Sequence, residues 1–401
     1  MRKLIFTLLI ILCSLQITQG QWTKMYCPLT GPVSGFINSG TRIFVVGVGG
    51  VCISTNNGVN WTVFNNGLTN LNVWSFAISG TNIFAGTYGG GVFRSSNNGE
   101  SWTSVNDGLS DYYIRGLTVW GTTLFAGTGS SGVFLSTNDG TNWIAANGGI
   151  SNQYITSIKV LGANLFAGTY GGGVFFSSNN GISWSAINNG LTNNNIIALE
   201  VVGANLFAGT YGGGVFFSSN NGTNWINTGL IGDTVETFAV SGTNLFAGTF
   251  GSGVFLSNNN GASWIAKNEG MSILYIYCLL TTSNYIFAGS VAGNYFRRPI
   301  SEMIDIQNIS TEVPSRFTLS QNYPNPFNPF TNIRYDLRKP GFVKLVVFDA
   351  LGRELETFVN EQQSPGTYSV DWNASEYPSG VYFYRLQTDS YTEVKKMILA
   401  K

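Results

Sequence analysis

Short apolar segments alternate with polar, glycine-rich turns along residues 31–299. In one unit the pattern is a polar loop leading into an alternating segment (152–161), a second apolar segment (163–169), a glycine turn, and a third segment that ends at a tryptophan (174–184). Runs of this length between turn residues predict β-strands, four to each unit. No proline occurs from residue 33 to 298, as expected where each strand donates ladder hydrogen bonds.

An eight-residue motif ends each of six units, with its tryptophan at positions 61, 102, 143, 184, 225 and 264. The spacing is 41 residues four times and then 39, which indicates a repeat architecture. In each motif the Asn side chain is expected to bond backbone amides of a tight turn, the Gly to supply a positive φ, and the Trp to anchor the next strand. These positions are Asn56, Gly58, Trp61, Asn97, Gly99, Trp102, Asn138, Gly140, Trp143, Asn179, Gly181, Trp184, Asn220, Gly222, Trp225, Asn259, Gly261 and Trp264.

The motif resembles the Asp-box, or BNR, repeat of β-propellers, with Asn in the Asp position. Phenylalanines at equivalent places of the second segment number seven: Phe44, Phe84, Phe125, Phe166, Phe207, Phe246 and Phe287. We therefore predict an all-β fold with a seven-bladed propeller over 21–300. The seventh unit lacks the motif, whereas Gln21-Trp22-Thr23 matches Asn60-Trp61-Thr62, so the N-terminal strand is expected to complete blade seven and close the ring. The alternative is an open solenoid with caps.

Composition changes after a polar linker at 301–313, where prolines and charges become frequent. Alternating runs at 331–337, 343–348, 367–372, 381–386 and 393–399 predict a small Ig-like β-sandwich over 314–401. The motifs QNYPNPFNP (321–329), VFDALGR (347–353), SGVYFY (379–384) and KKMIL (395–399) resemble the type A C-terminal sorting domain of type IX secretion cargo. This resemblance implies a Gram-negative bacterium, recognition of 314–401 by the outer-membrane translocon, and a final position that is secreted or on the cell surface.

The first twenty residues have the pattern of a secretory signal peptide. Arg2 and Lys3 precede an apolar run at 4–15, and small residues follow, so cleavage is expected between Gly20 and Gln21. The run is too short to span a membrane, and no other candidate span occurs.

Composition excludes several function classes. Charged residues make up 10 % of the chain, twenty of each sign, which argues against nucleic acid or an anionic membrane as a partner. There is no histidine, so histidine bases and most zinc sites are excluded. We expect no metal and no cofactor, because the Asn-Asn-Gly turns offer few carboxylates. The mature cysteines Cys27, Cys52 and Cys278 either pair in an oxidising compartment or serve as small buried hydrophobes, and we favour the second interpretation.

An enzymatic interpretation depends on the few acidic residues of the propeller. The five arginines of the propeller lack the sequence context of a sialidase triad, and a glycosidase needs two facing carboxylates. Glu200 and Glu236 are the pair with the best prospect of reaching each other across neighbouring blades. Aligned first strands, however, put Lys159 beside Glu200, which favours an ion pair between blades. We predict that catalysis is absent.

Aromatic residues recur on the face where propellers bind ligands. Glycine turns there carry Tyr88, Tyr170, Tyr211 and Phe250, and neighbouring loops carry Tyr113 and Tyr154. Such rings stack on sugars, fill pockets of a protein partner, or pack one blade on the next. We therefore predict a monomeric, exported binding protein with a glycan or protein ligand. The alternatives are a carbohydrate-active enzyme and a structural or assembly scaffold.

Overall fold

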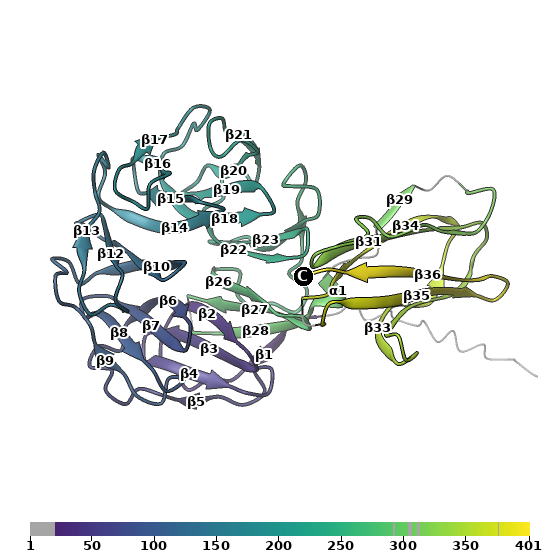
Figure 1. Ribbon diagram of the computed structural model, residues 1–401, viewed down its shortest axis with the longest axis horizontal. Coiled ribbons are helices and arrows are strands. Elements are labelled where there is room, and N and C mark those ends of the chain that lie inside the picture. Colours follow the sequence, from purple (N-terminus) through teal and green to yellow (C-terminus); the bar gives the residue numbers. More distant parts are fainter. Residues whose placement is uncertain (1–20, 292, 304–306, 311–312, 376) are drawn as a thin grey trace, which may run out of the picture.

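The computed structural model describes residues 21–401 except 292, 304–306, 311–312 and 376. These residues form seven four-stranded antiparallel sheets in a ring, followed by a smaller domain of two four-stranded sheets (Figure 1). The predicted signal segment 1–20 and its Gly20 lie outside the described residues.

The innermost strands of the seven ring sheets are β2 (Val33–Ser39), β6 (Val73–Ser79), β10 (Ile114–Trp120), β14 (Ile155–Leu161), β18 (Ile196–Val202), β22 (Val235–Ser241) and β26 (Ile276–Thr281). The second strands are β3 (Arg42–Gly47), β7 (Asn82–Thr87), β11 (Thr123–Thr128), β15 (Asn164–Thr169), β19 (Asn205–Thr210), β23 (Asn244–Thr249) and β27 (Tyr285–Ser290).

The third strands are β4 (Gly50–Ser54), β8 (Gly91–Ser95), β12 (Val133–Ser136), β16 (Gly173–Ser177), β20 (Gly214–Ser218), β24 (Gly253–Ser257) and β28 (Tyr295–Pro299). The outer strands are β5 (Thr62–Val63), β9 (Thr103–Ser104), β13 (Ile144–Ala145), β17 (Ser185–Ala186), β21 (Ile226–Gly229), β25 (Ile265–Ala266) and β1 (Thr23–Met25).

The two ends of the repeat region meet in the last sheet. Each innermost strand packs on the innermost strand of the next sheet, and β26 packs on β2. The N-terminal strand β1 pairs antiparallel with β28, with Thr23 opposite Arg297, and becomes the outer strand of the last sheet. The first and last sheets are therefore neighbours, joined by a strand from the start of the chain.

The core of the ring lies between neighbouring sheets. The seven phenylalanines of the second strands are completely buried, and each sits in an apolar cluster with residues of the adjacent sheet. Burying a Phe side chain contributes about 1.5–3 kcal/mol, so the repeated ring is a major source of stability.

The six motif turns have one hydrogen-bonding pattern. In the fourth, Ser177 Oγ accepts from the Gly181 amide at 3.0 Å, and Asn179 Oδ1 accepts from the Ser183 amide at 3.0 Å. Asn180 has φ +60° and Gly181 +77°, a left-handed pair that reverses the chain between the third and outer strands. The other five motifs repeat these bonds.

Tryptophans link most sheets to the preceding one. Trp184 Nε1 donates to the Ala146 carbonyl at 2.9 Å, and its amide donates to Gly148 O at 2.7 Å. The same indole bond is made by Trp102, Trp143, Trp225 and the N-terminal Trp22. Two tryptophans depart. Trp61 Nε1 donates to the Gly58 carbonyl of its own turn at 3.1 Å. The buried Nε1 of Trp264 has no acceptor among the described residues. Trp264 follows the 39-residue interval, where the longer strand β21 and Leu230, at φ +52°, change the neighbouring edge.

The C-terminal domain contains two four-stranded sheets, ordered β29-β34-β31-β30 and β33-β32-β35-β36. Their strands are β29 (Gln307–Ser310), β30 (Thr318–Leu319), β31 (Phe330–Leu337), β32 (Gly341–Phe348), β33 (Glu354–Gln363), β34 (Gly366–Asn373), β35 (Gly380–Thr388) and β36 (Thr392–Leu399). The shared core includes Tyr335, Trp372 and Tyr384.

The stretch expected as a linker, 301–313, contains regular structure. Helix α1 (Ile300–Met303) follows β28, and Met303 is fully buried in the core of the last ring sheets. Strand β29 pairs with β34 and belongs to the C-terminal domain. Strand β33 is not among the runs predicted from the sequence, because ELETFVNEQQ lacks the alternation of a half-buried strand. Thr243 Oγ1 donates to Asp371 at 2.9 Å and joins the ring to this domain.

Candidate binding site at the turn face of the ring

The turns between second and third strands all lie at one end of the sheets, which we call the turn face. Tyr88 directly follows β7, and Tyr170 directly follows β15. The backbone of Tyr88 bridges to Tyr113 in the next unit, and that of Phe250 bridges to Tyr275. The motif turns lie at the other end of the third strands, so the two sets of turns occupy opposite faces.

Every innermost strand carries a β-bulge at its second residue, just below the turn face. The register shifts at that residue in all seven sheets. The side chains at this position are each half-buried, and we call them the bulge ring: Ser34, Trp74, Arg115, Thr156, Ile197, Glu236 and Tyr277. A bulge leaves one residue out of the ladder and re-aims its side chain. The fold therefore gathers seven side chains of unlike chemistry around the centre of one face.

Arg115 lies between two aromatic rings of this face. Its guanidinium carbon is 4.7 Å from the centre of the Trp74 ring and 4.4 Å from that of Tyr154. Cation–π contacts of this kind contribute about 0.5–2 kcal/mol each. Arg115 Nε is buried and has no hydrogen-bond acceptor in the part of the chain that the structure describes.

The aromatic residues continue from Arg115 in both directions as a chain of ring contacts, which we call the aromatic arc. On one side Trp74 stacks on Tyr88 at 4.8 Å between ring centres, and Tyr88 meets Tyr113 at 4.6 Å. On the other side Tyr154 contacts Tyr170 at 5.7 Å, and Tyr170 contacts Tyr211 at 6.1 Å. The rings thus pack from sheet to sheet and still present surface: Tyr88 and Tyr170 are 42 % exposed and Tyr211 is 56 % exposed.

Phe250 belongs to a separate group on the same face. Its ring is 4.8 Å from Tyr275 and 6.1 Å from Tyr277. Tyr277 neighbours Glu236 in the bulge ring, and the pKa of Tyr277 is raised by burial and by the charge of Glu236. Burial raises the pKa of Glu236 itself to about 7. A carboxylic acid that is partly protonated at neutral pH therefore lies beside these rings.

Glu200 and Glu236 do not occupy equivalent places. Glu200 accepts a 2.8 Å hydrogen bond from Lys159 Nζ in the preceding sheet. The pairings of β18 and β22 place Glu200 three residues further along its strand than Glu236. Three residues correspond to about 10 Å of rise, near the upper limit of the spacing between glycosidase carboxylates.

A buried carboxylate holds one loop of this face in place. Asp111 accepts bonds from the Tyr113 amide at 2.9 Å and from the amide and hydroxyl of Ser130 at 2.8 Å. Burial raises the pKa of Asp111, but these hydrogen bonds outweigh burial, so the pKa lies below its usual value. The Asp111 carboxylate thus holds Tyr113 beside the one of these turns in which Gly129 stands in place of the aromatic residue.

The sequence identified the tyrosines of the arc, but it did not reveal the role of Trp74 in the arc or that of Tyr277 beside Phe250. Both are the second residue of an innermost strand, directly after a buried Val or Ile. Aligning the seven strands on that apolar residue would have revealed them.

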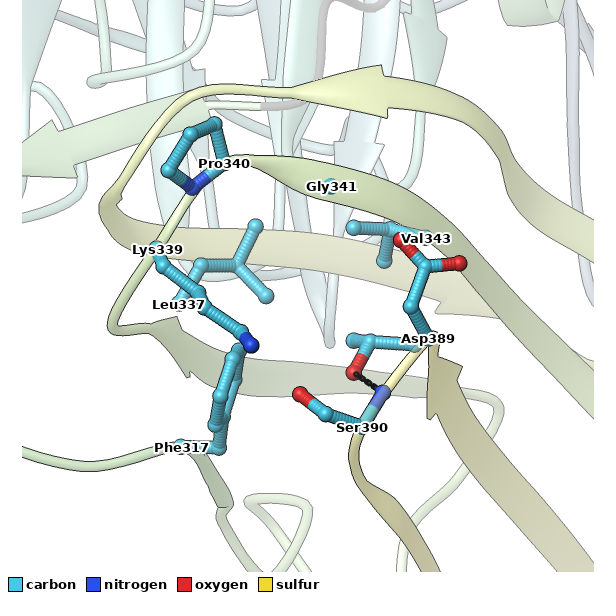
Figure 2. A pocket seen from close by; sticks show the side chains of 9 residues that line it. Phe317, Leu337, Lys339, Pro340, Gly341, Val343, Asp389 and Ser390 are labelled. Atoms are coloured by element: carbon cyan, nitrogen blue, oxygen red, sulfur yellow. Dashed lines mark hydrogen bonds between the residues drawn. The ribbon is translucent and has the colours of Figure 1, made fainter.

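Other candidate sites are few in the described parts of the chain. A small hollow in the C-terminal domain is lined by Phe317, Leu337, Lys339 and Asp389 among others, and its space of about 10 Å³ suits a single water molecule (Figure 2). Among the described residues no group of three or more Cys, Asp or Glu side chains is arranged to hold a metal ion. No helix among them is long and apolar enough to cross a membrane.

Residues 321–400 match the family model of the secretion system C-terminal sorting domain. This region is a sorting domain of the type IX secretion system. It indicates secretion to the cell surface or beyond. No curated protein matches the sequence of the chain significantly.

Solved structures resemble the ring. The β-propeller domain of Doa1 aligns with a TM-score of 0.56 at 12% identity, covering 70% of this chain and 96% of that one. PorZ, a surface component of the type IX secretion system of Porphyromonas gingivalis, aligns with a TM-score of 0.56 at 15% identity, covering 94% of this chain and 61% of PorZ. The GH74 enzyme of Niastella koreensis aligns with a TM-score of 0.53 at 17% identity, covering 67% and 43%. At these identities the likeness shows a propeller-like fold and leaves catalysis unassigned, since enzymes and non-enzymes share it.

Proposed function

We propose that the chain is an exported binding protein without catalytic activity, whose seven-bladed, closed propeller holds a glycan or protein partner on its turn face. Delivery across the outer membrane is the task of the sorting domain, after export directed by the signal segment 1–20. The likeness to PorZ, a surface component, is consistent with such a location.

The observation that carries this proposal is the unsatisfied Arg115 within the aromatic arc. A buried N–H without an acceptor costs about 1–3 kcal/mol, and an acceptor on a bound partner would recover that energy. The two rings fix the guanidinium plane, so a carboxylate, hydroxyl or carbonyl of a partner would meet a preorganised donor. Half-exposed Tyr88, Tyr170 and Tyr211 offer faces for sugar rings or apolar side chains beside it.

The acidic residues support binding better than hydrolysis. Glu200 is committed to Lys159, and its place in the strand differs from that of Glu236. A hydrolase remains the second candidate because Glu236, with a pKa of about 7, has the acidity of a general acid at neutral pH. In that case Glu236 would be the acid and Glu200 its partner carboxylate.

The test is a glycan-array and pull-down screen with the mature chain 21–401, followed by affinity measurements on single variants. Tyr170→Ala and Arg115→Lys should each weaken binding by about 10- to 100-fold. The first variant removes an aromatic face, and the second removes the Nε–H donor and the planar guanidinium. Ile182→Ala is the matched control, since Ile182 is 71 % exposed in a motif turn on the opposite face.

Unchanged affinity in both variants would refute the turn-face proposal. Glycan turnover that disappears in Glu236→Gln, with binding retained, would establish the hydrolase instead.

A further inference from the structure

Two cysteines that lie 25 positions apart in the chain meet where the ring closes. Cys27 follows β1, the outer strand of the last sheet, and Cys52 lies in the middle of β4 in the first sheet. Both belong to the apolar cluster around Phe287 and Tyr295. Cys52 is buried within this cluster and Cys27 packs against it, and each thiol is a hydrogen-bonding neighbour of the other and of the Leu29 backbone.

We propose that Cys27 and Cys52 form a disulfide after export, which joins the last sheet to the first. Both cysteines are free thiols of one apolar cluster. The bridge closes a loop of about 25 residues around the junction of the two chain ends, where strand β1 is held by three residue pairs.

Cys278 is the third thiol of this cluster, but its environment differs. Cys278 Sγ is fully buried and donates to the Val33 carbonyl at 3.7 Å. Burial raises its pKa well above the usual value. Cys278 therefore stays reduced in this proposal.

The chemistry is thiol–disulfide exchange with a periplasmic disulfide donor, a protein or glutathione disulfide R–S–S–R. Cys27 is the attacking thiol because it is half-exposed, and its pKa is lowered by the hydrogen bond with Cys52. Its thiolate breaks the donor S–S bond and releases one RS⁻, which takes a proton. Cys52 then attacks Cys27 Sγ in the mixed disulfide and releases the second RSH. Two electrons and two protons pass to the donor, and one S–S bond forms in the protein.

The order of these steps follows from the hydrogen bond between the two thiols, which lowers the pKa of Cys27 and raises that of Cys52. The pKa of Cys52 is raised by the hydrogen bond and charge of Cys27, with burial adding to the shift. When Cys27 becomes part of the mixed disulfide, it carries no charge and that penalty disappears. Cys52 is then able to act as the resolving thiolate.

The experiment uses the mature chain 21–401, directed to an oxidising periplasm, denatured without reductant and alkylated with iodoacetamide. We expect one adduct before reduction, on Cys278, and three after reduction. Proteolysis should yield a peptide holding Cys27 joined to one holding Cys52. The variant Cys278→Ser should show no adduct before reduction and two after, and Cys27→Ser should show two throughout.

A second measurement covers stability. Reduction should lower the Tm of the wild type and of Cys278→Ser by about 5 °C, and leave that of Cys27→Ser unchanged. Three adducts without reduction, even after incubation with glutathione disulfide, would overturn the proposal. A bridge that includes Cys278, or an equal loss of Tm in Cys27→Ser, would overturn it as well.

Discussion

The replacement Glu236→Gln tests how burial in the bulge ring affects a single carboxyl group. Burial raises the pKa of Glu236 from 4.5 to about 7, so between these pH values the folded chain retains a proton that the unfolded chain releases. Protonated Glu236 is the form that the folded chain favours, and its full contribution to the free energy of unfolding is present below about pH 4.5. Stability from this group is lost as the pH rises through 7.

The magnitude follows from the two pKa values. Their difference of about 2.5 corresponds to about 3 kcal/mol in the free energy of unfolding between pH 4 and pH 8. A ring of about 280 residues has an unfolding entropy near 0.6 kcal/mol/K, so the same loss lowers Tm by about 5 °C. Glutamine keeps the shape of the side chain and has no charge to desolvate, so the variant should lack this component.

The assay is denaturant-induced and thermal unfolding of the wild type and Glu236→Gln at closely spaced pH values from 4 to 8. The quantity of interest is the difference between the two proteins, because other groups titrate equally in both. Glu100→Gln is the control, since Glu100 is exposed in a motif turn. If Glu236→Gln retained the pH dependence of the wild type within about 0.5 kcal/mol, folding would not raise the pKa of Glu236 and the reasoning would fail.

Two further predictions concern the ring and its delivery. Trp184→Phe should destabilise the ring by about 2 kcal/mol in denaturant unfolding, because it removes the indole donor to Ala146. Trp264→Phe should cost about 1 kcal/mol or less, because the indole of Trp264 has no acceptor in the described structure. Truncation after Met303 should leave a folded ring in the periplasm, and cell fractionation with limited proteolysis would detect it. A chain that ends at Met303 keeps this buried side chain in the core of the ring and lacks β29, which belongs to the C-terminal domain. Surface delivery of the truncated chain would contradict the sorting role of 314–401.

Much of the fold was accessible from the sequence because its information is local. The 41-residue period, the Ser-x-Asn-x-Gly turns and the seven buried phenylalanines each depend on residues close together in the chain. The match between Trp22 and Trp61 also located the closing strand, because Trp22 makes the same indole bond to the preceding sheet as most motif tryptophans. The pairing of Lys159 with Glu200 followed from aligning neighbouring units.

Contacts between units were decided by the tertiary structure. The sequence places Trp74, Arg115 and Tyr154 in three successive units, but only the packed ring brings the arginine between two aromatic rings. The bulges that create the bulge ring are a property of strand pairing, since they arise from the register of two strands. In the same way Cys27 and Cys52 belong to one apolar cluster because β1 pairs with the last sheet and the last sheet packs on the first. Period and turn chemistry determine each sheet, whereas closure of the ring determines which side chains of different sheets share a site.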